Sequence, residues 1–260
     1  MNMIDSIGIF DSGVGGTSIW KEIVKLLPNE DTIYLADSKN APYGSKSVEE
    51  ILQLSIRNTE ILLGKGCKLI VVACNTATTN AIDYLRANYS IPFIGIEPAI
   101  KPAALRTKTN RVGVLATKGT LSSALFQSTS NIHAAGIEVF EQEGKGLVEL
   151  VESGKQHSEG AKQLLQTYIE PMLEEGIDCL VLGCTHYPYL IPTLRKILPA
   201  EIQIVDSGFA VAKQTRAILK ENRLLRKENL DSTHYFYTNK DVDLLNQFVR
   251  SLGRTQFLDF

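Results

Sequence analysis

The chain has 260 residues, 44% of them hydrophobic and 22% charged, which is the composition of a folded globular protein and excludes disordered and fibrous classes. It carries 27 basic and 29 acidic side chains, so no excess of positive charge points to a nucleic acid partner. The longest charge-free runs, 69–82 and 179–194, are shorter than the stretch of about 18 apolar residues that suggests a membrane span.

Strand-like and helix-like segments alternate along the whole chain. Runs rich in β-branched and apolar residues predict strands at 7–10, 32–36, 68–73, 93–96, 111–116, 136–141, 178–183, 202–205 and 234–238. Helices are expected between them, including one that opens with the capping box of Ser47 and Glu50. This alternation predicts an α/β fold with mostly parallel sheet covered by helices.

Two sequence echoes indicate a duplicated α/β unit. Gly8 and Gly113 lie in similar strand segments, and Cys74 and Cys184 each follow an apolar strand at nearly the same separation. The segment 97–111 has the character of a crossing between two compact units. We therefore expect two similar units that face each other across a pseudo-twofold axis.

The four cysteines show no short paired spacing of a disulfide framework, and no basic residue precedes the first predicted strand as in a secretory signal. A cytoplasmic location is expected. Cys74 and Cys184 are each predicted at the carboxyl end of a strand and before a helix, where α/β sheets bind ligands and a helix N-terminus favours a thiolate. Cys67 and Cys179 lack polar neighbours and are expected to be packing residues.

The residue pattern disfavours three kinds of chemistry. No C-x2-C pair occurs, which disfavours a metal site. A hydrolase with His186 as base is disfavoured because the side chains of Cys184 and His186 are expected to point apart, and the second cysteine would have no role. Pyridoxal phosphate chemistry needs a lysine in a phosphate-binding setting, and no lysine has one.

The glycine-rich loop 10–16 does not fit a dinucleotide fingerprint, because Ser18 stands where the third glycine belongs. It predicts a tight turn that exposes Asp11 and Ser12 to a cleft. The loop 37–45 follows a strand and either offers backbone N–H groups and the Tyr43 hydroxyl to a ligand or is an ordinary surface loop. Glu152, at the end of an apolar segment, could approach the cleft, but a carboxylate on a helix surface is the favoured interpretation.

Two thiols on opposite walls of a cleft suit the inversion of a carbon centre, since one removes a proton from one face and the other returns a proton to the opposite face. In this hypothesis Asp11 and His186 adjust the protonation of the cysteine nearer to each. A further group of small polar residues would hold the carboxylates of the substrate: Ser12, Asn75, Thr76 and Thr185.

Four motifs, 10–16 (FDSGVGG), 42–44 (PYG), 73–76 (ACNT) and 183–188 (GCTHYP), together resemble the glutamate racemase family. The resemblance implies a homodimeric racemase without cofactor or metal, which interconverts L- and D-glutamate and supplies D-glutamate for peptidoglycan synthesis. It also implies two α/β domains, residues 1–97 with 208–260 and residues 98–207.

By this resemblance, Cys74 and Cys184 match the catalytic pair, and Asp11 and His186 match the assisting groups. The residues that match substrate contacts are Asp11, Ser12, Tyr43, Gly44, Asn75, Thr76, Thr185 and His186. The chain departs from the family at 17–18, where more apolar residues are usual, and at 141–145, which is more charged. A racemase of aspartate or another acid, and a clamp that binds a small acid without turnover, remain as alternatives.

Overall fold

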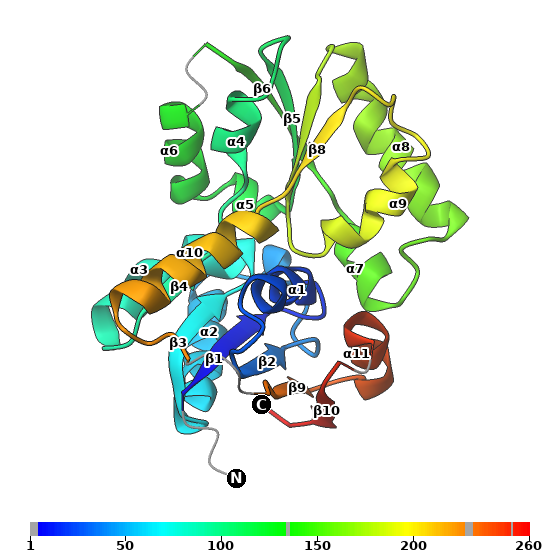
Figure 1. Ribbon diagram of the computed structural model, residues 1–260. Helices are drawn as coiled ribbons and strands as arrows, with labels where there is room; N and C mark the ends of the chain where they lie inside the picture. Colours follow the sequence, from blue (N-terminus) through cyan, green and yellow to red (C-terminus); the bar gives the residue numbers. More distant parts are fainter. Residues whose placement is uncertain (1–4, 134–135, 227–230, 251) are drawn as a thin grey trace.

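The computed structural model describes residues 5–133, 136–226, 231–250 and 252–260. Two parallel sheets with flanking helices form its frame, one of six strands and one of four (Figure 1). This confirms the predicted α/β class. Among the described helices, none combines the length and the apolar character needed to cross a membrane.

The six-stranded sheet has the order β10-β9-β2-β1-β3-β4. Its strands are β1 (Ser6–Asp11), β2 (Thr32–Ala36), β3 (Cys67–Val72), β4 (Phe93–Gly95), β9 (His234–Thr238) and β10 (Arg254–Phe257). The first four and β9 fall within or close to predicted strands. The short edge strand β10 was not predicted, because its sequence has no apolar run and its side chains are mostly exposed.

The helices of this sheet cover both of its faces. They are α1 (Thr17–Leu26), α2 (Val48–Gly64), α3 (Asn75–Asn88), α10 (Gly208–Glu221) and α11 (Val242–Val249). Ile7 and Ile9 of β1 join the apolar cluster that includes α1, α10 and α11, whereas Phe10 joins the cluster that includes α2 and α3. This alternation follows from the two-residue period of a strand, and it explains why β1 is apolar on both faces.

The four-stranded sheet has the order β6-β5-β7-β8. Its strands are β5 (Arg111–Ala116), β6 (Glu138–Glu143), β7 (Cys179–Gly183) and β8 (Gln203–Val205). Its helices are α4 (Ile100–Ala104), α5 (Lys118–Leu121), α6 (Ala124–His133), α7 (Leu147–Glu152), α8 (Glu159–Glu174) and α9 (Ile191–Leu194), and short 3-10 turns η1 (Tyr43–Ser45) and η2 (Tyr187–Leu190) precede α2 and α9. One buried apolar cluster contains side chains of both sheets, so the two units share a core where they meet.

The strand registers explain how distant residues come together. Phe10 of β1 lies beside Val72 of β3, so the loop that follows β1 and the start of α3 emerge at the same edge. In the second sheet, Ala116 of β5 lies beside Gly183 of β7 in the same way. Cys74 therefore lies just beyond β3, the neighbour of β1, and Cys184 lies just beyond β7, the neighbour of β5.

Candidate active site

A small cavity lies where the carboxyl ends of the strands of the two sheets meet. Its volume is about 10 Å³, room for about one water molecule. The residues that line it are Ser12, Pro42, Tyr43, Gly44, Cys74, Asn75, Thr76, Thr117, Val148, Gly183, Cys184, Thr185 and His186. Every predicted site residue except Asp11 is in this set. Both cysteines are nearly buried, with exposed fractions of 5% for Cys74 and 8% for Cys184.

Cys74 caps the N-terminus of α3. Its Sγ accepts a hydrogen bond from the amide of Ala77 at 3.4 Å and lies 3.7 Å from the Ser12 hydroxyl. Burial and the negative charge of Asp11 raise the pKa of Cys74 well above its usual value, although these two hydrogen bonds act in the opposite direction. The expected preference for thiolate at a helix N-terminus is therefore outweighed, and the group is a thiol at neutral pH.

Cys184 faces a histidine. Its Sγ lies 3.8 Å from Nδ1 of His186. The prediction that these two side chains point apart is wrong, because residues two apart lie on the same face even of an extended segment. The chain also turns directly after β7, with the amide of Tyr187 donating to the carbonyl of Cys184 at 3.1 Å. The other objection to a hydrolase still applies, since a single nucleophile leaves Cys74 without a role.

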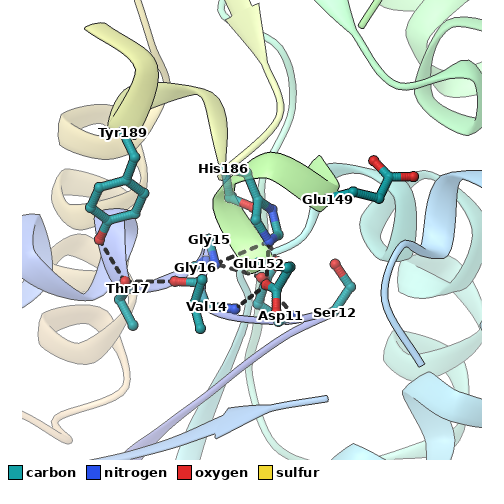
Figure 2. Close-up of polar contacts among 12 residues, drawn as sticks. Asp11, Ser12, Val14, Gly15, Gly16, Thr17, Glu149, Glu152, His186 and Tyr189 are labelled. Atoms are coloured by element: carbon teal, nitrogen blue, oxygen red, sulfur yellow. Dashed lines mark hydrogen bonds and ion pairs between the residues drawn. The ribbon is translucent and has the colours of Figure 1, made fainter. Parts of the chain in front are cut away.

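The imidazole of His186 is paired with a carboxylate. Its Nε2 lies 2.7 Å from Oε1 of Glu152, and both side chains are buried (Figure 2). Burial lowers the pKa of His186, but hydrogen bonds to Cys184 and Glu152 and the charge of Asp11 raise it well above its usual value. The amide of Gly15 also approaches Nε2, at 3.3 Å. A protonated Nε2 cannot accept that bond, so the ion pair with Glu152 is the interaction that holds.

The expectation that Glu152 is a surface carboxylate is wrong. Its Oε1 accepts a hydrogen bond from the amide of Val14 at 2.6 Å, and its side chain is directed into the interior. The sequence carried a signal for this position. In α7 the buried residues are Leu147, Val148, Val151 and Glu152, a spacing that places Glu152 on the same helix face as Val148.

Asp11 lies behind the cavity wall. Its side chain is fully buried, with Oδ1 accepting hydrogen bonds from the amides of Gly13 and Gly16, both at 3.0 Å, and Oδ2 accepting one from the Thr185 hydroxyl at 3.0 Å. The predicted exposure of Asp11 is therefore wrong. Burial raises its pKa from 3.8 to about 6, against the opposing charge of His186. Through these hydrogen bonds, the Asp11 carboxylate connects the glycine loop to the segment that carries Cys184.

The glycine loop is glycine-rich because the second unit packs directly against it. A Cβ at Gly13 would overlap Oε1 of Glu152, and a Cβ at Gly15 would overlap the ring of His186. The amide of Gly13 is also engaged by Asp11 rather than free for a ligand. The glycines of the loop thus allow the side chains of Glu152 and His186 to approach the backbone closely. This agrees with the absence of a phosphate-binding fingerprint in the loop.

Polar groups from both units face each other around the cavity. The hydroxyl of Thr76 lies 2.9 Å from that of Thr117, a wall residue that was not predicted from the sequence because no motif marks it. The Asn75 amide nitrogen is buried without a hydrogen-bond partner among the described residues, so a donor remains available. The Tyr43 hydroxyl donates to Asp37 at 2.5 Å, a bond that fixes the orientation of this wall residue.

A larger cavity of about 510 Å³ adjoins the small one. The two share wall residues from both units: Pro42, Gly44, Thr117 and Val148. Three lysines line the larger cavity, namely Lys46, Lys118 and Lys145, together with two glutamates, Glu143 and Glu149. Among the described residues, no group of three or more His, Cys, Asp or Glu side chains is arranged to hold a metal ion.

Racemases are similar to this chain both in sequence and in fold. Residues 7–215 match the family described as Asp/Glu/Hydantoin racemase. The glutamate racemase of Ectopseudomonas mendocina is 47% identical over 88% of this chain and 88% of its own. That of Stutzerimonas stutzeri is 46% identical over 98% and 96%.

Solved structures agree. A glutamate racemase isoform from Bacillus anthracis superposes with a TM-score of 0.87 at 31% identity, covering 98% of both chains. The Escherichia coli glutamate racemase, solved in complex with L-glutamate and the activator UDP-MurNAc-Ala, gives the same TM-score, identity and coverage. An aspartate racemase from Picrophilus torridus, with a TM-score of 0.55 and 21% identity, shares the fold alone. From the sequence match and the structural match together, the chain belongs to the Asp/Glu/hydantoin racemase family and, within it, to the glutamate racemases.

Proposed function

We propose that this chain interconverts L- and D-glutamate with Cys74 and Cys184 as its two acid–base groups, and that it supplies D-glutamate for peptidoglycan synthesis. The observation that carries the proposal is the single cavity lined by both cysteines, one contributed by each sheet unit. One thiolate removes the Cα proton and becomes a thiol. The other thiol delivers its proton to the opposite face of Cα and becomes a thiolate, so protons and charge balance.

The surroundings of the sulfurs suggest which one begins as the base. Cys74 is a buried thiol with a raised pKa, whereas the Sγ of Cys184 lies 3.8 Å from Nδ1 of His186, an imidazole that is ion-paired with Glu152. The first turnover from this state starts with deprotonation by Cys184 and ends with protonation by Cys74. The product state has the sulfur roles exchanged, which is the state that accepts the opposite enantiomer.

Substrate carboxylates are held by neutral donors in this proposal. Asn75 has an unpaired amide nitrogen, and the hydroxyls of Ser12, Thr76 and Thr185 stand around the same cavity. Such donors can also stabilise the negative charge that develops on the carboxylate as the Cα proton leaves. Asp11 acts from behind, through its bond to Thr185.

Glutamate must enter from the larger cavity. The small cavity of about 10 Å³ holds much less than an amino acid, so the walls shared by the two cavities have to separate before binding. The three lysines of the larger cavity attract the two carboxylates of glutamate, and the two glutamates of the cavity attract its ammonium group. We therefore assign the conformation described above to the closed form of the active site.

The domain division and the assembly are also proposals. We assign residues 1–97 with 208–260 to one domain and 98–207 to the other, because α10 packs against α1 and β9 pairs with β2. A cytoplasmic homodimer is proposed on the resemblance to glutamate racemases. The four free, buried cysteines suit a reducing compartment.

Exchange of the Cα hydrogen with solvent tests the activity. The purified protein, dialysed against a chelator and given no cofactor, is incubated with L-glutamate in D₂O. We expect the optical rotation to decay to zero while deuterium appears at Cα, as measured by proton NMR. A protein that only binds glutamate would exchange nothing, and that result would overturn the proposal. The same assay with L-aspartate tests for a racemase of the shorter acid.

A further inference from the structure

A hydrogen-bonded pair outside the cavity joins the two units beside the Cys184 segment. Thr17 is the first residue of α1 and is fully buried, and Tyr189 lies in η2, on the segment that carries His186. The Thr17 and Tyr189 hydroxyl oxygens are 2.5 Å apart (Figure 2).

The directions of the bonds around this pair are fixed by counting hydrogens. The Thr17 hydroxyl donates its one hydrogen to the carbonyl of Val14 at 2.6 Å. It must therefore accept from Tyr189, and the Tyr189 oxygen in turn accepts from Nζ of Lys21 at 3.2 Å. A directed chain of bonds thus runs from Lys21 through Tyr189 and Thr17 to the Val14 peptide.

Val14 is also where the His186 side chain is anchored. Its amide donates to Glu152, which pairs with His186, while its carbonyl accepts from Thr17. Two side chains of one segment, His186 and Tyr189, are therefore tied to the same residue of the glycine loop. Ser18 adds a third tie, because its hydroxyl donates to the carbonyl of Thr185 at 2.9 Å.

None of these ties reaches the other sulfur. The hydrogen-bond partners of Cys74 are Ser12 and Ala77, which belong to the first unit. Proton transfer depends on the placement of the sulfur against Cα to within a fraction of an ångström. A device that fixes only the segment of Cys184 should therefore act on only one of the two proton transfers.

We propose that Thr17 and Tyr189 are positioning residues for the proton transfer that Cys184 performs, holding its segment against the glycine loop. This inference rests on the proposed racemase function. Tyr189→Phe is a suitable probe, because the ring packs edge-on against Phe248 with centroids 4.6 Å apart, and that contact needs no hydroxyl. The substitution then removes the hydrogen bonds alone.

The test measures primary deuterium isotope effects on kcat/KM with α-deuterated L-glutamate and α-deuterated D-glutamate. Tyr189→Phe and Thr17→Val should each lower kcat/KM about three- to tenfold, the effect of one hydrogen bond. The isotope effect should rise for the enantiomer deprotonated by Cys184 and fall for the other, since the Cys184 step becomes more rate-limiting. The double variant should lose little more than either single variant.

Two controls separate positioning from a general structural effect. Thr17→Ser keeps the hydroxyl and should retain both wild-type isotope effects. Tyr89→Phe removes a tyrosine hydroxyl that donates to Glu60 on the surface, and it should change nothing. Isotope effects are measured on active molecules, so a smaller folded fraction leaves them unchanged.

The outcomes are distinguishable. Isotope effects that stay equal to those of the wild type, or that move in the same direction for both enantiomers, overturn the positioning role while the racemase function stands. A wild-type protein that exchanges no Cα hydrogen overturns the proposed function and the positioning role with it. Opposite movement for the two enantiomers supports both.

Discussion

Cys74 follows β3, the neighbour of the strand β1, and Cys184 follows β7, the neighbour of the strand β5. The two positions are equivalent in topology, yet their surroundings differ. Cys74 is held by a hydroxyl and a backbone amide, whereas Cys184 faces a histidine that is ion-paired with Glu152. A duplicated fold can thus supply two sulfur positions while local residues give each its own electrostatics. The asymmetry suits a reaction in which one sulfur starts as acid and the other as base.

The largest expected effect comes from removing either sulfur. Cys74→Ser and Cys184→Ser should each lower the racemisation rate by roughly three orders of magnitude, because a hydroxyl is a far weaker acid–base group than a thiol. The rate is followed by circular dichroism from both enantiomers. Cys179→Ala, a buried cysteine in β7 that does not line the cavity, is the matched control and should retain its rate per folded molecule. A near-normal rate in either serine variant would show that the replaced sulfur is structural, and Cys74 and Cys184 would then not be a catalytic pair.

Gly15→Ala should have the next largest effect, and it acts on the Cys184 side. The added Cβ would overlap the His186 ring, so the imidazole must move from its place beside Cys184. We expect a loss of about a hundredfold in kcat/KM from the displaced group and of about 1–3 kcal/mol in the free energy of unfolding. Gly64→Ala in α2 is the control, since apart from the backbone of its own helix and its chain neighbours nothing lies within 4 Å of the added Cβ. Equal activities of the two variants would argue against a role for the His186 position.

Glu152→Gln should reduce activity about tenfold and shift its pH dependence, because it removes one group that raises the pKa of His186. With that pKa lowered, the imidazole loses its proton at a lower pH. The high-pH decline of kcat/KM should therefore move to lower pH, as measured from rate profiles over pH 6–10 (roughly the range of His and Cys titration). Glu170→Gln, an exposed carboxylate on α8, serves as the control. An unshifted profile would show that the pair does not govern catalysis.

The sequence was informative where function lies at strand ends and less so where it depends on contacts between units. Cys74 and Cys184 were found because each follows an apolar strand, a local pattern. Glu152 was missed because its partners, Val14 and His186, are remote in sequence. The burial of Asp11 was missed for the same reason, since its bond to Thr185 closes only after the two units meet.

Asp11 offers the most specific prediction, one on stability and not on activity. Its pKa is about 6 in the folded protein against 3.8 ordinarily, so the folded state binds more protons between these values and stability falls as pH rises through that window. At most about 3 kcal/mol is involved. Asp11→Asn keeps an oxygen for the amides of Gly13 and Gly16 but has no charge. Urea unfolding at pH 4 and at pH 7 should show the variant gaining stability relative to the wild type as pH increases. If the stability difference between variant and wild type is the same at both pH values, the imidazolium of His186 already compensates the buried carboxylate. Asp11 would then belong electrostatically to the charged surroundings of Cys184, and Cys74 alone would have neutral surroundings.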